Sequence, residues 1–241
     1  MAYDFLGLVN EVNKRVNEVE LTTSNFATGK GFYAHAKDAV NAAIRDINQH
    51  EFNWPFNHVE QEDVLSADVS RYPFPHDTKL INFETFRIKK DATLGNRTTR
   101  LSIMAYEEYL DHHVEQEYDS TTRQGVPHFV IHGPALEYIV TPEPDKAYTV
   151  VYEYYRVPVD LALHDDVPSI PERFKHVIVD GAMHYGYLFR GNTQDALVAK
   201  EKFEEGIKNM RTTLINRTYY VRSGMIAQNT GGSINSTRIA T

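Results

Sequence analysis

The sequence predicts an α+β protein in which helices from both ends of the chain form one helical bundle, with an antiparallel β domain inserted between them and an extended C-terminal tail. Apolar residues recur at helical spacing near both ends, and short β-prone segments separated by turn residues fill the middle. The last residues are rich in Gly, Asn, Ser and Thr. We therefore expect four parts, at residues 1–56, 57–160, 161–216 and 217–241.

Two helices are predicted in the N-terminal half of the bundle. The first has Asp4 as its N-cap and one apolar stripe, made of Phe5, Leu8, Val9, Val12, Val16 and Val19. The second begins at Phe32, is rich in alanine and continues to about residue 50. It ends before Pro55, which favours an extended backbone at Trp54.

Two longer helices are predicted in the C-terminal half. The third starts near Pro171 and ends at Gly191, and its Gly181 suits a close helix crossing. Its expected stripe is Phe174, Val177, Ile178, Ala182, Tyr185, Leu188 and Phe189. The fourth is capped by Thr193, and its expected stripe is Ala196, Leu197, Ala199, Lys200, Phe203, Ile207, Met210 and Leu214.

The central part contains five β-prone segments, which we interpret as one antiparallel sheet: residues 80–88, 100–105, 128–133, 136–141 and 148–157. A short helix is expected at 106–117, packed on this sheet through Tyr109, His113 and Tyr106. Large residues on both faces of the segment 148–155 indicate that both sides of the sheet are covered, by this chain or by another, although ordinary strand aromatics would give the same pattern.

Composition limits the possible function classes. Hydrophobic residues make up 41% and charged residues 24% of the chain, which is typical of a folded globular protein. The sequence has no cysteine, which excludes disulfides, thiolate metal sites and a cysteine nucleophile. No apolar run approaches the length of a membrane span, and no secretory signal is recognised at the N-terminus, so we expect synthesis in the cytoplasm.

Charge is unevenly distributed along the chain. The net charge is −8, yet residues 206–241 contain five Lys and Arg residues and no Asp or Glu, so residues 1–205 carry −13. An acidic body does not favour wrapping of nucleic acid, because phosphate neutralisation by cations supplies most of that affinity. The chain therefore combines an acidic body with a basic tail.

Known catalytic patterns are not matched. The segment 28–32 lacks the first glycine and the Ser or Thr of a phosphate-binding loop, and no serine lies in a strained Gly-rich turn. Histidines occur in pairs, at His112 with His113 and at His128 with His132, without a third ligand at metal spacing. We predict no catalytic, cofactor-binding or metal-binding residue, while paired carboxylates at Glu107 with Glu108 and at Asp165 with Asp166 stay formally possible.

The tail is the predicted partner-binding site. It has too few large apolar groups to fold by itself, yet it carries more of them than a linker needs. Such a segment can become ordered on a partner, although a disordered terminus is the alternative. The expected binding residues are Arg217, Tyr219, Tyr220, Val221, Arg222, Met225, Ile226, Ile234, Arg238 and Ile239.

Three segments give the chain a family resemblance. The opening LVNEVNKRVNE, the helix KDAVNAAIRDINQHEFNWPFN and the closing block from PSIPERF to TTLINR resemble the head-to-tail adaptor, or head-completion, proteins of tailed bacteriophages. The resemblance covers residues 5–57 and 167–217 and weakens across the β-rich part.

The resemblance implies a non-enzymatic virion protein of the neck, made in the host cytoplasm. It would form a homo-oligomeric ring of about twelve copies below the portal protein, with the tail docked on the portal, further tail or nozzle proteins below, and genomic DNA passing through the channel without specific binding. Two alternatives stay open. One is a tail-side neck or stopper protein, and the other is a hydrolase using His112, His113, Asp165 or Asp166.

Overall fold

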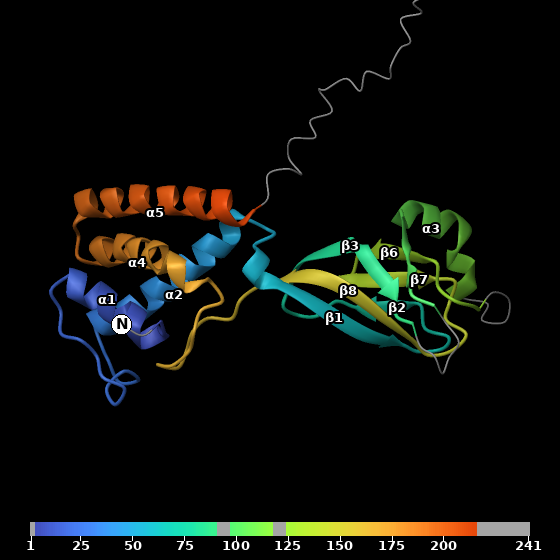
Figure 1. Cartoon of the computed structure of the whole chain (residues 1–241), viewed down its shortest axis with the longest axis horizontal. Helices are drawn as coiled ribbons and strands as arrows, with labels where there is room; N and C mark the ends of the chain where they lie inside the picture. The colour runs from blue at the N-terminus through green and yellow to red at the C-terminus, as the bar shows by residue number, and fades with distance from the viewer. Residues whose placement is uncertain (1–2, 91–96, 118–123, 216–241) are drawn as a thin grey trace, which may run out of the picture.

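The computed structural model describes residues 3–90, 97–117 and 124–215. Four helices lie together at one end of an elongated molecule, and the strands lie at the other end (Figure 1). The helices of the bundle are α1 (Phe5–Arg15), α2 (Phe32–His50), α4 (Lys175–Phe189) and α5 (Thr193–Leu214). The first two thus pack with helices more than a hundred residues later in the chain, as expected for a bundle built from both ends.

The helix boundaries follow local chemistry. The Asp4 side chain accepts a hydrogen bond from the Gly7 amide and caps α1, as predicted. α1 ends at Arg15 and is followed by Asn17 in the left-handed region at φ 60°, so Val19 is 74% exposed and does not extend the stripe. Gly191 follows α4 at φ 75°, which confirms the predicted stop.

Two details of the C-terminal helices differ from the prediction. Asn192, and not Thr193, caps α5, because its side-chain oxygen accepts the Asp195 amide. The predicted stripe positions at the α4–α5 turn are exposed, with Leu188 46%, Phe189 56% and Leu197 62% accessible. Leu188 and Phe189 lie at the end of α4, and Leu197 lies near the start of α5.

The bundle core consists of closely packed apolar side chains from all four helices. A Cβ atom on Gly181 of α4 would lie 2.7 Å from the Phe203 ring of α5 and 2.9 Å from Ala43 of α2. This position therefore permits a close three-helix contact, as the sequence predicted. Trp54 is fully buried at the end of α2 and donates its indole N–H to the Ile47 carbonyl at 2.8 Å.

The strands form two sheets instead of the single antiparallel sheet that we expected. One sheet has the order β1-β8-β3-β4 and the other the order β2-β7-β6-β5. The strands are β1 (His58–Leu65), β2 (Arg71–Pro73), β3 (Thr78–Ile88), β4 (Thr99–Arg100), β5 (Ser102–Met104), β6 (Phe129–Gly133), β7 (Glu137–Thr141) and β8 (Tyr148–Arg156). β5 and β6 pair in parallel, whereas the other strand pairs are antiparallel.

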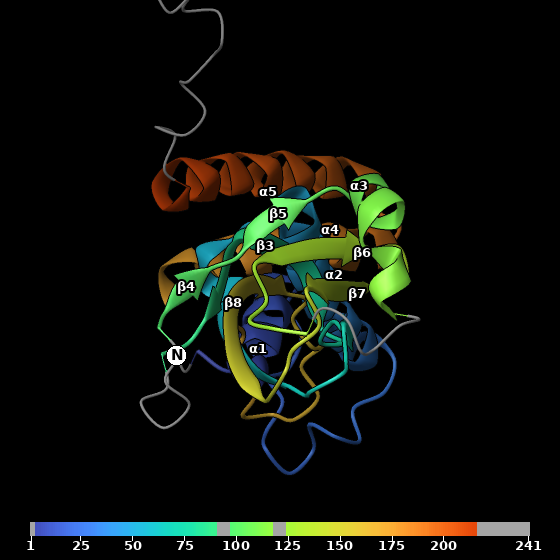
Figure 2. The same cartoon turned by 90° about the vertical axis from the view of Figure 1, so that its right-hand side faces the viewer.

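Side chains from both sheets share one aromatic core, which includes Phe86, Tyr138 and Tyr152. The Phe86 and Tyr152 rings stack at 4.5 Å. Burial alternates along β8: the side chains of one face are buried as far as Tyr154, those of the other face are half-buried, and Arg156 at the end of the strand is exposed. The second face is therefore covered only in part among the described residues. Seen along the long axis, the strands lie in front of the bundle (Figure 2).

The predicted helix at 106–117 is α3 (Tyr106–His112), followed by a 3-10 turn at Val114–Glu117. Tyr109 is 1% exposed and packs with Met104, Ile131 and Ile139 against the second sheet, as expected. Tyr106 and His113 are half-buried beside it.

Short polar contacts join the two ends of the molecule. Lys79 at the start of β3 donates to the Glu51 carbonyl at 2.7 Å and also to the Asn48 carbonyl, so its ammonium group lies at the C-terminal end of α2. Burial lowers the pKa of Lys79, and the nearby Glu51 carboxylate opposes that shift. The β-rich end is thus held against the bundle by a specific charge-to-carbonyl contact.

Candidate functional site

The predicted partner-binding residues lie outside the described residues. All ten, from Arg217 to Ile239, follow the last described residue, so their placement is not part of the structure. The structure does define where this segment starts. Ile215 is 9% exposed, and Arg211 in the last turn of α5 forms an ion pair with Glu51 at the end of α2. The last described residue, Ile215, therefore lies near the junction of the bundle and the strands.

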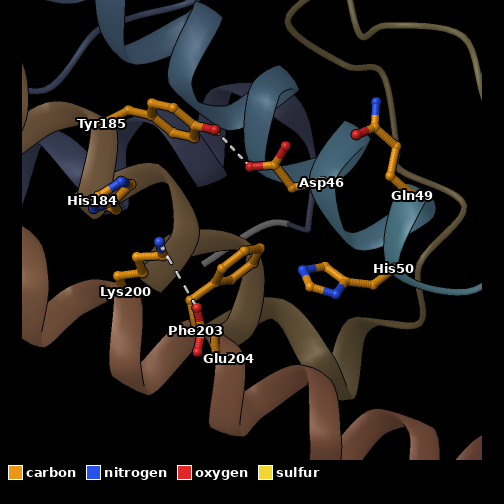
Figure 3. Close-up of a pocket in the computed structure, with 8 residues that line it drawn as sticks. All are labelled: Asp46, Gln49, His50, His184, Tyr185, Lys200, Phe203 and Glu204. Atoms are coloured by element: carbon orange, nitrogen blue, oxygen red, sulfur yellow. Dashed lines mark hydrogen bonds and ion pairs between the residues drawn. The ribbon is translucent and has the colours of Figure 1, made fainter.

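A polar pocket of about 370 Å3 lies between α2, α4 and α5 (Figure 3). The Tyr185 hydroxyl donates to the Asp46 carboxylate at 2.6 Å, and this contact together with burial raises the pKa of Tyr185 to about 12. The Lys200 ammonium lies 4.0 Å from the Glu204 carboxylate. Because these charged groups contact one another, the pocket looks like a solvated helix surface and not like a set of groups directed at a substrate.

A carboxylate between the two sheets is a second arrangement, which the sequence did not reveal. Asp63 of β1 accepts hydrogen bonds from Tyr138 at 3.0 Å and from Tyr152 at 2.9 Å. Burial, with the adjacent carboxylate, raises the pKa of both tyrosines above the ordinary value, so both hydroxyls stay protonated and act as donors. This network joins strands of different sheets and has a structural role.

The histidines and carboxylates considered for catalysis are not brought together. His112 and His113 lie at the end of α3 in the β-rich part, whereas Asp165 and Asp166 lie in a loop against the bundle. Within the described ranges, no three His, Cys, Asp or Glu side chains are grouped so that they could hold a metal ion. The structure thus gives no support to the hydrolase alternative.

The remaining candidates have ordinary local roles. The carboxylate of Asp166 accepts the amides of Ala162 and Leu163, and these hydrogen bonds lower its pKa. Glu107 and Glu108 are exposed in the first turn of α3, where negative charge complements the helix dipole. His132 stacks on Phe74 at 5.6 Å, while His128 is exposed.

An apolar groove of about 510 Å3 lies at the start of β3. Its lining residues include Phe74, Leu80, Ile81, Phe83 and Leu136, and Leu136 is 73% exposed. The other lining residues are Pro75, His76, Thr78, Lys79 and His132. No Asp or Glu occurs among the described residues that line it, so the groove combines an aromatic wall with a rim that carries Lys79 and two imidazoles.

A second apolar surface is the segment 157–167, which we call the strap. It leads from β8 back to the bundle, and Val157, Val159, Leu163 and Val167 are 50%, 85%, 63% and 62% exposed. Exposed apolar side chains that gather on one segment are typical of protein interaction surfaces. The sequence alone did not reveal this surface, because the exposure of its aliphatic residues depends on the fold.

Exposed apolar surfaces such as the groove and the strap are typical of proteins that bind other proteins. In the described ranges, no helix is long and apolar enough to cross a membrane. The sequence model of the SU10 adaptor protein family matches residues 3–226, which is nearly the whole chain. The chain therefore belongs to the SU10 adaptor protein family.

Membership makes the chain a phage structural adaptor, located in the virion, that binds other virion components. A comparison with curated proteins gave no significant match.

Proposed function

We propose that the protein forms a ring of about twelve copies between the portal and the tail of the virion and extends the DNA channel. The observation that supports this most directly is the match to the SU10 adaptor protein family over residues 3–226. An adaptor has to bind a different component on each side, and the two ends of the chain differ in structure, with helices at one end and strands at the other (Figure 1).

Docking on the portal is assigned to the tail. Residues 217–241 carry three arginines and no carboxylate, together with scattered large side chains such as Tyr219, Tyr220 and Ile234. Because α5 ends beside the junction, the tail starts from a fixed point on the body. We expect it to gain order on an acidic portal surface, where burial of its apolar groups offsets the entropy lost.

The acidic body fits passage of DNA. Residues 1–205 carry a net charge of −13, and carboxylates facing the channel would repel the phosphate backbone instead of holding it. A ring of such subunits would let genomic DNA slide without specific contacts.

Truncation tests this function. Removing residues 217–241 should abolish binding to the portal, measured by co-sedimentation, while the thermal unfolding midpoint changes little because the described core clusters of the body are kept. A matched control replaces Arg222 and Arg238 with Lys and should keep most of the binding. Undiminished portal binding by the truncated protein would contradict the assigned role of the tail.

A tail-side neck or stopper protein is the second candidate, because the same family membership fits it. The two functions differ in the partner bound first. The purified chain is mixed with the portal in one experiment and with tail components in another. The proposed adaptor should bind the portal in the absence of tail components, whereas a stopper protein should not.

A further inference from the structure

The bundle and the β-rich end have separate apolar cores. Trp54 belongs to the bundle cluster and Tyr152 to the larger cluster of the strands, and no apolar residue in the described part of the chain belongs to both. A pocket of about 190 Å3 lies at the junction, lined by Ile44 of α2, by Arg156 of β8 and by part of the strap. Two bodies without a shared core are expected to move relative to each other unless other contacts hold them.

Two described segments of the chain cross the junction, and they cross side by side. One enters β1 at His58, and the other leaves β8 after Arg156. His58 is paired directly with Tyr155 of β8, and the two strands run together from the junction (Figure 1). On the bundle side of the crossings, Asn57 and Leu161 are hydrogen-bonded to side chains of α2. Two adjacent crossing points at the ends of secondary-structure elements are the geometry of a hinge axis.

Lys79 makes a third contact with the bundle, away from this axis. It lies on β3, which pairs with the side of β8 opposite to β1. With neighbouring strands about 4.8 Å apart, β3 is roughly 10 Å from β1. Thr78 and Leu80 pair with consecutive residues of β8, so Lys79 is one extra residue, a β-bulge. Because bulges redirect side chains, this one gives Lys79 a direction that the regular strand would not.

The side chain of Lys79 ends on the C-terminal end of α2. Its ammonium group donates to the carbonyls of Asn48 and Glu51, and it lies 5.5 Å from the centre of the Phe52 ring. A cation is favoured at this end of a helix, where the last carbonyls have no partner within the helix. Among the described residues of β3, Lys79 alone is hydrogen-bonded to the bundle.

We propose that the junction is a hinge whose axis passes through the two crossing points and whose latch is Lys79. While Lys79 is bound to α2, the strands cannot turn about β1 and β8. When the latch opens, the pocket at the junction gives the β-rich end room to turn. A component bound at one end of the subunit thereby changes the orientation of the other end. This inference does not depend on the proposed ring, because the free chain tests it.

The distance between two spin labels tests the latch, because the sequence contains no cysteine that would be labelled as well. The full chain carries Glu108→Cys on α3 and Asn209→Cys on α5, both at exposed positions. Double electron–electron resonance then gives the distribution of distances between the β-rich end and the bundle. We expect one narrow distribution with the native Lys79, and a distribution wider by about twofold or more in Lys79→Met.

Two control variants separate the latch from a general effect of losing a lysine. Lys79→Arg keeps a cation that can reach the same carbonyls and should keep the narrow distribution. Lys89→Met removes a lysine that pairs with Glu62 at 2.9 Å within the β-rich end, and it should also leave the distribution narrow. Lys79→Gln is a milder loss of charge that should widen the distribution even if Lys79→Met does not fold. Circular dichroism and thermal unfolding show which variants are folded.

The outcomes decide the proposal on the free chain. A narrow distribution in the folded Lys79 variants that lack the charge would overturn the latch. A wide distribution in the native chain, or equal widening in Lys89→Met, would overturn it as well. Portal binding is measured separately, so a chain with a working latch that does not bind the portal would contradict the proposed function alone.

Discussion

The Tyr152 hydroxyl of β8 lies 2.9 Å from the Asp63 carboxylate of β1, which also accepts the hydroxyl of Tyr138 from the other sheet. Both tyrosines are fully buried as residues. Removing the acceptor would leave two buried donors without a partner, so Asp63→Leu should lower the free energy of unfolding by about 2–4 kcal/mol in urea titrations. Glu60→Leu, an exposed change on the same strand, should have an effect below about 0.5 kcal/mol.

A rescue distinguishes unsatisfied hydroxyls from lost packing. Adding Tyr138→Phe and Tyr152→Phe to Asp63→Leu removes the donors as well, and we expect most of the lost stability to return. If the triple variant is no more stable than Asp63→Leu, the hydrogen bonds are not the cause.

The close helix crossing predicts a contrast between two glycines of α4. At Gly181 a Cβ would lie 2.7 Å from Phe203, so Gly181→Ala should destabilise the fold by about 1–3 kcal/mol through overpacking. At Gly186 the nearest atom would be 3.8 Å away, on Phe32, so Gly186→Ala should raise stability by about 0.5–1 kcal/mol through helix propensity. Equal thermal shifts for the two variants would argue against the crossing.

Two asparagines of α1 should respond in opposite ways to the same substitution. Asn13 is fully buried, and neither polar atom of its side chain has a hydrogen-bond partner among the described residues. Asn10 instead bonds both the amide and the carbonyl of Leu21, at 2.7 and 2.9 Å. Asn13→Leu should therefore stabilise by about 1 kcal/mol, and Asn10→Leu should destabilise by about 1–3 kcal/mol, in denaturant titrations. A loss of stability in Asn13→Leu would indicate that its amide has a partner.

Stability should fall in alkaline solution. The pKa of Tyr148 is raised to about 12 by burial and by its hydrogen bond to Asp145, and that of Tyr185 is raised to about 12 by its hydrogen bond to Asp46 and by burial. From the ordinary pKa of 10.0 upward, the unfolded chain loses these protons while the folded chain keeps them. The unfolded state then binds fewer protons, so the free energy of unfolding decreases as pH rises from 10.0 to about 12.

Tyr185→Phe removes one of these groups and should make that decrease less steep in urea titrations at successive pH values. An unchanged slope in the variant would show that Tyr185 does not titrate differently in the folded and unfolded states.

The bundle was largely predictable because its signals are local. The spacing of apolar residues predicted all four helices. Asp4 correctly predicted the start of α1, and Gly191 the end of α4. Strands pair with segments that are distant in the sequence, so the prediction of a single antiparallel sheet was wrong. β1 was missed because charged and polar residues occur on both of its faces, such as Glu60 and Glu62 on one and Gln61 and Asp63 on the other. The parallel pairing of β5 with β6 was missed because it joins segments separated by a helix. The division into four parts stays a prediction.

The sequence predicted that the site binds a partner protein, but it did not predict the exposed surfaces of the described residues. Composition indicated that the tail binds a partner, but the ten predicted residues lie outside the described part of the chain, so that assignment stays a prediction. The strap and the groove could not be recognised from sequence, because exposure of Val159 or Leu136 depends on which neighbours the fold supplies. Leu136 also adopts the left-handed backbone conformation, at φ 56°, which is uncommon for leucine and is not predicted from sequence.

Electron microscopy of the full chain mixed with its portal tests the central claim most directly. We predict a closed ring of this protein coaxial with the portal on its tail-facing side, with one continuous channel through both. A portal that stays bare at saturating concentrations of the chain, or a ring found only on tail components, would contradict the proposed role.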